Sequence, residues 1–255
     1  MPATPARTRR SDSRGPTRDT AKPSSIANAP IKPVSDGVFF TLADRLPRGR
    51  HKLSREQVNA AQRERLLVAM TELLAALGYR GFGTTEIASR AGISLATFYS
   101  CFEDKDACVF AGYDRFIDVL LRKLTALDLD EPDLGKLLGA IIKTYLKTLQ
   151  ADLVVARAYQ VEIDALGAQA RERRRKSLQR FAAFIQERVT SITAGGQPLA
   201  DVPWTSYIGV VYAARQIASD SIDQSARPQL TSLADDLRDF MLDAFRAPRT
   251  SRRST

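Results

Sequence analysis

The sequence predicts an all-α protein, on three observations. From residue 54 to residue 246, apolar side chains recur at the three- and four-residue spacing of a helix surface. No segment alternates apolar and polar residues over the length of a strand. Glycines and prolines fall between the periodic segments, where they separate one helix from the next. We therefore expect a small helical unit at residues 54–113 and a larger helical domain at residues 114–246.

The composition is that of a globular protein. Of the 255 residues, 44% are apolar and 26% are charged, which supplies enough apolar surface for a core and excludes general disorder. The longest apolar runs, such as Leu66–Met70, have about five residues, whereas a membrane-spanning helix needs about 20. No apolar stretch follows the basic N-terminus, so we expect no secretory signal. With one histidine and two cysteines, the chain is expected to hold no metal, no disulfide framework and no cofactor.

The two ends of the chain carry most of the positive charge. Residues 1–35 contain seven Arg or Lys against two Asp and are rich in Pro, Ser and Thr, which predicts a disordered basic tail. Residues 36–53, the basic arm, begin with a small apolar patch and end in a basic run. Residues 247–255 add three arginines in a second disordered tail. A net charge of +9 and a pI near 9.8 indicate a polyanionic partner.

The first predicted helix begins after Ser54. A serine followed three residues later by Gln57 has the sequence of a capping box. Gly78 ends the helix, because glycine readily adopts the left-handed conformation that follows a helix C-terminus. The buried face is formed by Leu66, Leu67, Met70, Leu73, Leu74 and Leu77.

Further helices follow at regular breaks. Glu103 to Asp106 open a long helix whose apolar face contains Phe110, Tyr113 and Ile117. Beyond Pro132 we expect five helices, separated by glycine and proline. They cover residues 133–150, 152–166, 168–194, 203–224 and 229–246.

Residues 84–102 have the pattern of a helix-turn-helix. A short helix ends at Ala91, Gly92 makes the tight turn, and Ser94 caps a second short helix. A helix presented in this way can enter the major groove of DNA by its N-terminus. On periodicity alone, three ordinary core helices joined by a glycine turn remain the alternative.

The two faces of the second short helix differ. Phe98 and Phe102 are four residues apart and are expected to pack inward. The outward side carries small, apolar and hydroxyl-bearing residues that would lie near phosphates and base edges. They are Ser94, Leu95, Ala96, Thr97, Tyr99 and Ser100.

Residues at fixed positions add a resemblance to this pattern. They are Gly78-Tyr79, Glu86-Ile87-Ala88, Ala91-Gly92-Ile93-Ser94, Thr97-Phe98-Tyr99, Phe102 and Lys105. Over residues 54–113 the chain resembles the DNA-binding domain of TetR/AcrR-family transcriptional regulators, in a branch with a basic N-terminal arm. The resemblance implies an N-terminal three-helix helix-turn-helix domain and a larger C-terminal helical domain for ligand binding and dimerisation.

The resemblance also implies roles for individual residues. Leu95 and Ala96 would face the bases, and an apolar Leu95, where the family often has Lys or Arg, suits a thymine methyl group. Gly83 stands where a capping threonine is common. The implied phosphate contacts are Thr84, Thr85, Thr97, Tyr99 and Lys105.

The basic arm is a second candidate for DNA contact. Residues 54–113 have a net charge of −1, so attraction to phosphates needs groups outside them. We hypothesise that Arg48, Arg50 and Lys52 follow the duplex backbone or enter an adjacent minor groove. A solvated linker is the alternative.

The last two predicted helices are candidates for a dimer interface. Their apolar stripes include Trp204, Ile208 and Val211 in one helix and Leu237 and Phe240 in the other. Two such helices could form a four-helix bundle with a second copy, and the resemblance places dimerisation here. A two-fold pair would read a palindromic operator, because its half-sites follow the symmetry of the protein. An ordinary core within one chain is the alternative.

The middle helices are expected to enclose an inducer pocket. Polar residues in or beside their apolar segments are candidates for ligand contacts. They are Tyr145, Tyr159, Gln160, Glu162, Tyr207, Tyr212 and Arg215. A polar group satisfied within the helical core is the alternative for each, and Glu162 with Arg215 could form an ion pair. The basic run Arg171–Lys176 is interpreted as a solvated face.

These observations favour a dimeric, cytoplasmic, ligand-responsive DNA-binding regulator, most simply a repressor. An all-helical enzyme is the first alternative, but the single histidine lies in the basic arm and no phosphate-binding glycine motif is present. A protein-interaction module that no longer reads DNA is the second. Cys101 and Cys108 could sense redox state, or be buried thiols.

Overall fold

The computed structural model of this chain describes residues 31–42, 54–127, 133–193 and 202–246. Within these ranges the protein contains nine α-helices and no β-strand, as expected for an all-α fold. The α-helices are α1 (Arg55–Leu77), α2 (Thr84–Ala91), α3 (Leu95–Cys101), α4 (Lys105–Thr125), α5 (Leu134–Ala151), α6 (Leu153–Gln160), α7 (Ala168–Thr193), α8 (Trp204–Gln224) and α9 (Ala234–Arg246). Three 3-10 helices lie between them: η2 (Tyr79–Gly81), η3 (Glu162–Leu166) and η4 (Leu230–Leu233).

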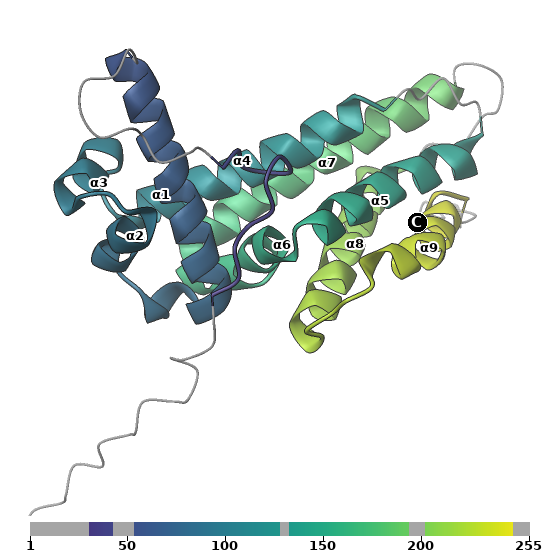
Figure 1. Cartoon of the computed structure of the whole chain (residues 1–255). Helices are drawn as coiled ribbons and strands as arrows, with labels where there is room; N and C mark the ends of the chain where they lie inside the picture. The colour runs from purple at the N-terminus through teal and green to yellow at the C-terminus, as the bar shows by residue number, and fades with distance from the viewer. Residues whose placement is uncertain (1–30, 43–53, 128–132, 194–201, 247–255) are drawn as a thin grey trace, which may run out of the picture.

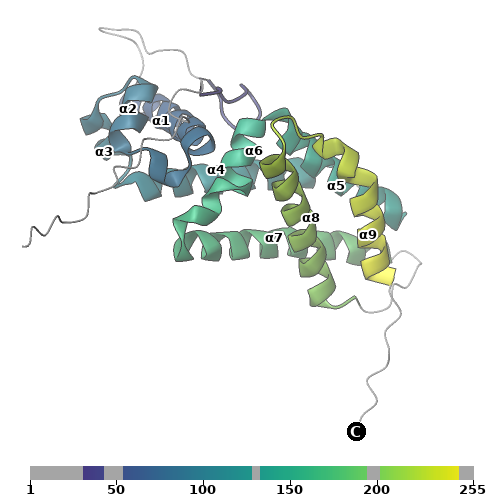
Figure 2. The same ribbon diagram turned by 90° about the horizontal axis from the view of Figure 1, so that it is seen from below.

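The helices form a small unit and a larger bundle that share one core. Helices α2 and α3 pack on α1 at one end of the molecule, whereas α8 and α9 lie at the other (Figures 1 and 2). The expected domain boundary after residue 113 falls inside α4, which begins beside α3 and continues into the bundle. No helix among the described residues is both long and apolar enough to cross a bilayer.

The capping residues predicted from the sequence hold the ends of α1. The Gln57 backbone N–H donates to Ser54 Oγ at 3.2 Å, and the Ser54 N–H donates to Gln57 Oε1 at 2.8 Å. Gly78 follows the helix with a φ of 67°, a conformation that suits glycine. Both predictions for α1 are confirmed.

The expected helix at residues 152–166 is interrupted. Helix α6 ends at Gln160, and η3 follows it. The Gln160 carbonyl accepts hydrogen bonds from Arg215 Nη2 at 2.7 Å and from Ser219 Oγ at 3.0 Å, both on α8. Tertiary donors therefore engage a carbonyl that a continuing helix would use itself, which periodicity along the chain does not reveal.

The segment of residues 31–42, here called the strap, corrects two expectations about the N-terminus. We expected disorder through residue 35 and a basic arm from residue 36. Instead Val34, Phe39 and Phe40 are buried, and the Phe39 ring lies 5.2 Å from the Phe116 ring of α4. The segment has too few apolar residues for a core of its own, but it adds them to one formed by α1 and α4.

Buried carboxylates on two helices bind the strap backbone. The Val34 N–H donates to Glu72 Oε1 of α1 at 3.0 Å, and the Ser35 N–H donates to Asp152 Oδ2 at 2.7 Å, immediately before α6. Glu72 also pairs with Arg90 of α2 at 2.5 Å. The strap thus joins the small unit to the larger bundle (Figure 1).

Candidate nucleic-acid interface and ligand cavity

Helices α2 and α3 meet in the predicted tight turn. Gly92 has a φ of 62° and a ψ of 41°, which is the left-handed conformation, and its N–H donates to the Ser89 carbonyl at 3.0 Å. The Ile93 N–H then donates to the Ala88 carbonyl at 2.9 Å. Ser94 caps α3 by accepting the Thr97 N–H at 3.1 Å. The helix-turn-helix geometry is confirmed.

The inward and outward faces of α3 follow the sequence prediction. Phe98 and Phe102 are buried, with their ring centroids 5.9 Å apart. On the opposite side Leu95 is 39% exposed and Tyr99 is 54% exposed, and Ala96 is exposed as well. Neighbouring exposed apolar side chains often mark a site of interaction. The start of α3 is therefore a candidate contact surface.

The fold brings two of the predicted phosphate contacts together. Thr84 Oγ1 at the start of α2 and Tyr99 Oη on α3 lie 3.2 Å apart, although they are 15 positions apart in sequence. The N-cap of α2 is Gly83, which supplies no side-chain cap, and the Gly83 N–H donates to Glu86 Oε2 at 2.8 Å. Thr85 is exposed beside them. The N-terminus of α2, whose N-cap residue has no side chain, and two hydroxyl groups thus share one edge of the surface.

The remaining hydroxyl groups of α3 also make bonds within the helix. Ser94 Oγ and Thr97 Oγ1 lie 2.8 Å apart, and Ser100 Oγ donates to the Thr97 carbonyl at 2.8 Å. Ser94 and Ser100 are exposed, whereas Thr97 is half-buried. A hydroxyl oxygen in such a bond keeps further capacity to donate or accept.

Lys105 has a structural task that the sequence did not indicate. Its Nζ donates to the carbonyls of Tyr79 at 2.8 Å and Phe82 at 3.0 Å, and it lies 3.8 Å from the centroid of the Tyr79 ring. Burial lowers the pKa of this ammonium, against the opposing influence of Asp106 and Glu86. Two of its three donors are therefore used to hold the loop before α2. Its contact with phosphate remains a prediction.

Two arginines of α1 hold the helix-turn-helix in place, and sequence reasoning missed both. The Arg63 guanidinium lies 4.1 Å from the Phe102 ring centroid and donates to the Cys101 carbonyl at 2.8 Å, at the end of α3. Arg65 Nη2 donates to the Ala91 carbonyl at the end of α2. A cation favours a helix C-terminus, but the sequence does not show which helix end a distant arginine reaches.

The basic arm residues Arg48, Arg50 and Lys52 lie outside the described residues. Their proposed contact with DNA stays a prediction.

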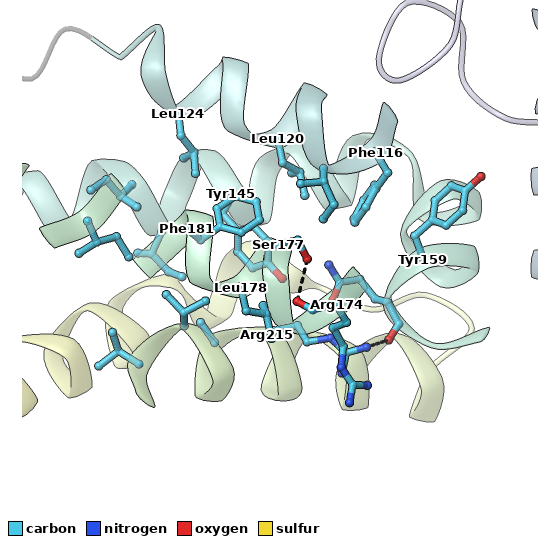
Figure 3. A pocket seen from close by; sticks show the side chains of 18 of the residues that line it. Phe116, Leu120, Leu124, Tyr145, Tyr159, Arg174, Ser177, Leu178, Phe181 and Arg215 are labelled. Atoms are coloured by element: carbon cyan, nitrogen blue, oxygen red, sulfur yellow. Dashed lines mark hydrogen bonds between the residues drawn. The ribbon is translucent and has the colours of Figure 1, made fainter. Parts of the chain in front are cut away.

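A cavity of about 60 Å³, here called the central cavity, lies inside the larger bundle. Side chains from all six helices α4 to α9 line it (Figure 3). Those labelled in the figure are Phe116, Leu120, Leu124, Tyr145, Tyr159, Arg174, Ser177, Leu178, Phe181 and Arg215. Most of the lining is apolar, and the polar side chains gather toward one end.

The polar end contains a hydrogen-bonded pair and two arginines. Tyr113 Oη and Ser177 Oγ lie 2.7 Å apart, and burial raises the pKa of the Tyr113 phenol. Arg174 of α7 and Arg215 of α8 both pair with Asp164 of η3, the latter at 3.3 Å. Two cations thus share one carboxylate beside the cavity.

The structure brings together four of the seven residues predicted to contact a ligand. Tyr145, Tyr159, Gln160 and Arg215 line the cavity. The Tyr145 hydroxyl is buried and makes no hydrogen bond of normal geometry with the described residues. Burial raises the pKa of this phenol, whereas the Arg215 guanidinium and the Gln160 side chain lower it.

The Tyr159 ring faces the cavity, but its hydroxyl points away from it (Figure 3). That hydroxyl lies 2.8 Å from Thr71 Oγ1 of α1, and burial raises the pKa of the phenol. Tyr159 therefore connects the cavity wall with the long helix that supports α2 and α3.

Glu162, Tyr207 and Tyr212 do not line the central cavity, which corrects the prediction for these residues. Glu162 lies 3.7 Å from Arg157 and does not pair with Arg215. Tyr207 packs against Phe245 of α9, with ring centroids 5.0 Å apart, and Tyr212 is exposed on α8. Helical spacing places such residues on a face of a helix, but the neighbouring helices decide what that face meets.

Arg174 corrects the interpretation of the run Arg171–Lys176 as a solvated face. Arg173 and Arg175 pair at the surface with Asp114 and Glu172, but Arg174 turns inward to Asp164. Five of the six residues in the run are basic, so the sequence does not show which of them turns inward.

Comparison with known proteins agrees with this geometry. Residues 66–111 match the sequence profile of a family described as bacterial regulatory proteins, tetR family. The matched segment contains the C-terminal half of α1, all of α2 and α3, and the beginning of α4. Residues 66–111 therefore form a TetR-type DNA-binding domain. The chain is a DNA-binding transcriptional regulator.

Solved structures of other regulators share the fold of this chain. The fatty acid degradation regulator FadR from Bacillus halodurans is 17% identical, with a TM-score of 0.62 over 75% of this chain and 97% of that one. FadR from Bacillus subtilis, in complex with stearoyl-CoA, is 15% identical, with a TM-score of 0.60 over 71% and 97%. A transcriptional regulator from Rhodococcus sp. Rha1 is 23% identical, with a TM-score of 0.56 over 73% and 99%. No curated protein matches the chain.

Exposed apolar side chains also lie on the last two helices of the chain. Trp204, Tyr212 and Ile217 of α8 and Phe240 of α9 are between 40% and 46% exposed. Two members of the predicted stripes, Val211 and Leu237, are instead buried within the chain itself, as are Leu230 and Met241 beside them. The stripes therefore divide between the intrachain core and the surface, a division that periodicity did not predict.

The two cysteines are free thiols, with Cys108 buried and Cys101 half-buried. Burial raises the pKa of the Cys108 thiol, which disfavours the reactive thiolate. Among the described residues, no group of three or more His, Cys, Asp or Glu side chains is placed to hold a metal ion.

Proposed function

We propose that this DNA-binding regulator is a cytoplasmic repressor that binds a palindromic operator as a homodimer and leaves it when a small molecule enters the central cavity. The observation that carries the proposal is the outward-facing first turn of α3 beside the Thr84 and Tyr99 hydroxyl groups. A short exposed helix with backbone contacts at its flank has the arrangement needed to enter a major groove.

The proposed contacts divide into base reading and backbone positioning. Leu95 and Ala96 lie at the leading end of α3, where apolar side chains can meet thymine methyl groups. The N-terminus of α2 supplies backbone N–H groups for phosphates. Hydroxyl groups for phosphates come from Thr84, Thr85, Ser94, Thr97, Tyr99 and Ser100. Arg48, Arg50 and Lys52 are proposed to extend this contact along the duplex.

Replacing Tyr99 with phenylalanine tests the backbone contact with the loss of one oxygen atom. Because a hydrogen bond to a charged group contributes about 1.5 to 3 kcal/mol, we expect binding to weaken at least about tenfold. The measurement is fluorescence anisotropy with the DNA upstream of the protein's own coding sequence. Tyr212→Phe is the matched control, because Tyr212 is also an exposed tyrosine but lies on α8. Equal affinity of Tyr99→Phe and the wild type contradicts the assigned contact, and transcription from the same DNA tells repression from activation.

Dimerisation through α8 and α9 is supported by the exposed apolar side chains on these helices. Large apolar groups near 40% exposure lose contact with water when they meet a second copy. Helices α8 and α9 are neighbours, joined by the Tyr207 and Phe245 rings, so one symmetric interface can use both.

Phe240→Asp is expected to convert the dimer to monomers, with a dissociation constant at least about 30-fold higher. The reason is that an aromatic side chain buried in the proposed dimer interface is replaced by a charged one. Sedimentation velocity measures this change. Leu95→Asp is the control, because Leu95 has comparable exposure but lies on α3. A dimer that survives Phe240→Asp, or is lost equally in Leu95→Asp, excludes this interface.

The response to a ligand is supported by the cavity and by its connection to α1. A ligand shifts the protein between two conformations only if it binds one of them better. The Tyr159 ring lines the cavity while its hydroxyl contacts Thr71, so widening the cavity bears directly on α1. The similar FadR structure in complex with stearoyl-CoA supports a small-molecule ligand for this fold.

A further inference from the structure

We infer that the ligand of the central cavity is an amphipathic molecule with a single carboxylate, bound by Arg174 and Arg215 in exchange for Asp164. This inference rests on the proposed function, since it names the class of molecule that the cavity accepts. It is carried by the charges beside the cavity, by a buried hydroxyl group that makes no hydrogen bond of normal geometry, and by the apolar character of the remaining lining.

The charges at the polar end are unequal. The charged side chains that line the cavity are Arg174 and Arg215, both cationic. Asp164 pairs with both through one oxygen, Oδ2, while its other oxygen, Oδ1, is buried without a hydrogen-bond partner. One carboxylate thus faces two guanidinium groups, which leaves one positive charge in excess. A single incoming carboxylate would balance that charge, and its planar pair of oxygens suits a guanidinium fork.

Tyr145 provides a donor for the same group. Its hydroxyl is buried, lies at the cavity and makes no hydrogen bond of normal geometry in this structure. Such a buried polar group is costly to a protein unless another state satisfies it. Figure 3 shows the Tyr145 ring reaching into the cavity from α5, on the side opposite Arg215 of α8. A carboxylate held by the arginines would accept a hydrogen bond from this hydroxyl group.

The rest of the cavity is suited to an apolar tail. Apolar side chains make up most of the remaining lining, among them Leu120, Leu124, Ile141, Ile185 and Met241, which offer neither donors nor charges. A head group that satisfies the polar end therefore needs an uncharged, apolar body.

The present volume of the cavity links binding to a change of shape. About 60 Å³ is well below the roughly 300 Å³ or more of typical ligand pockets, so a tail must separate the surrounding helices. Release of Asp164 from the arginines would free η3 from α7 and α8. Glu162 of η3 lies close to Gly78, where α1 ends, so a movement of η3 would be felt beside the helix-turn-helix.

Isothermal titration of the full chain with dodecanoate, below its micellar concentration, tests the head group. Dodecanol, dodecylammonium and dodecanoyl-CoA carry the same tail with a neutral, a positive and a multiply negative head. We expect dodecanoate to bind at least tenfold more tightly than each of the other three. Equal or tighter binding of any of them overturns the inference, as does the failure of dodecanoate to bind.

Three variants separate recognition of the carboxylate from support of the fold. Arg174→Met is expected to weaken dodecanoate binding at least tenfold, whereas Asp164→Asn is expected to strengthen it, because the competing carboxylate is gone. Tyr145→Phe should weaken binding about fivefold without lowering the melting temperature, since its hydroxyl makes no hydrogen bond of normal geometry in this structure. Arg173→Met is the control, because Arg173 pairs with Asp114 at the surface. Weaker binding in both Arg174→Met and Asp164→Asn indicates a structural effect and overturns the exchange.

DNA release distinguishes this inference from the proposed function. If dodecanoate binds as expected but leaves the DNA complex intact, the inferred class of ligand is supported. The proposal that this ligand releases the repressor from DNA is then contradicted. If the protein binds its DNA but prefers dodecanol, the inference of a carboxylate ligand is overturned, whereas the proposal of a DNA-binding regulator is retained.

Discussion

Replacing Gly112 with alanine is expected to destabilise the protein by about 2 to 4 kcal/mol, although the same change stabilises most helix interiors by roughly 1 kcal/mol. Gly112 lies within α4, where it is buried. A Cβ atom at this position would overlap the Tyr159 hydroxyl and lie 2.9 Å from Met70 Cε. Tyr159 and Met70 are both fully buried, and Tyr159 is also bonded to Thr71, so neither side chain can move away without a cost in packing or hydrogen bonding.

Thermal and urea unfolding measure this effect. For a protein of this length we expect the melting temperature to fall by roughly 5 to 15 °C. Gly139→Ala is the matched control, because Gly139 is also buried within a helix but a Cβ there would meet Arg238 Cδ at an ordinary 3.4 Å. The cost of Gly112→Ala should shrink in a Tyr159→Phe background, where the overlapping oxygen is absent. Unchanged stability of Gly112→Ala would show that the packing around Tyr159 differs from this structure.

Ala96→Glu is expected to weaken DNA binding at least about 100-fold while leaving the fold intact. Ala96 is exposed in the first turn of α3, so the added side chain meets no neighbour in the free protein. In the proposed complex the same position faces base edges between two phosphate backbones, where a carboxylate is repelled and loses its water. A hundredfold loss corresponds to about 2.7 kcal/mol, and both half-sites of a dimer would bear it.

Fluorescence anisotropy measures the affinity, and circular dichroism confirms that the variant is folded. Gln186→Glu is the control, because it adds the same charge at an exposed position of α7. Its affinity should change little, since screening weakens surface charges beyond about 10 Å. An Ala96→Glu variant that binds as tightly as the wild type would remove α3 from the DNA interface. Loss of affinity in both variants would indicate a general effect of charge.

Local signals in the sequence predicted most of the secondary structure. Ser54 and Ser94 cap their helices, Gly78 and Gly92 follow helices with positive φ, and the two faces of α3 are as expected. Each of these features depends on residues within one or two turns, because capping and helical periodicity act over three or four positions. The exposed surface of α3 was predictable for the same reason.

Features that join distant parts of the chain were less accessible. The inward turn of Arg174, the burial of Phe39 and Phe40 and the use of Lys105 to hold a loop all depend on partners dozens of residues away or in another helix. Tyr207 and Glu162 were predicted to contact a ligand. In the structure Tyr207 packs against Phe245, and Glu162 pairs with Arg157.

The sequence by itself determined the helices, their caps, the glycine turn and the outward face of α3, since these follow from short-range hydrogen bonding and periodicity. The tertiary structure decided which polar side chains line the central cavity, that two arginines share Asp164, and that the strap joins the two parts of the protein. Burial and charge pairing depend on contacts between helices. Those contacts depend on how the helices cross, which the apolar periodicity of a single helix does not specify.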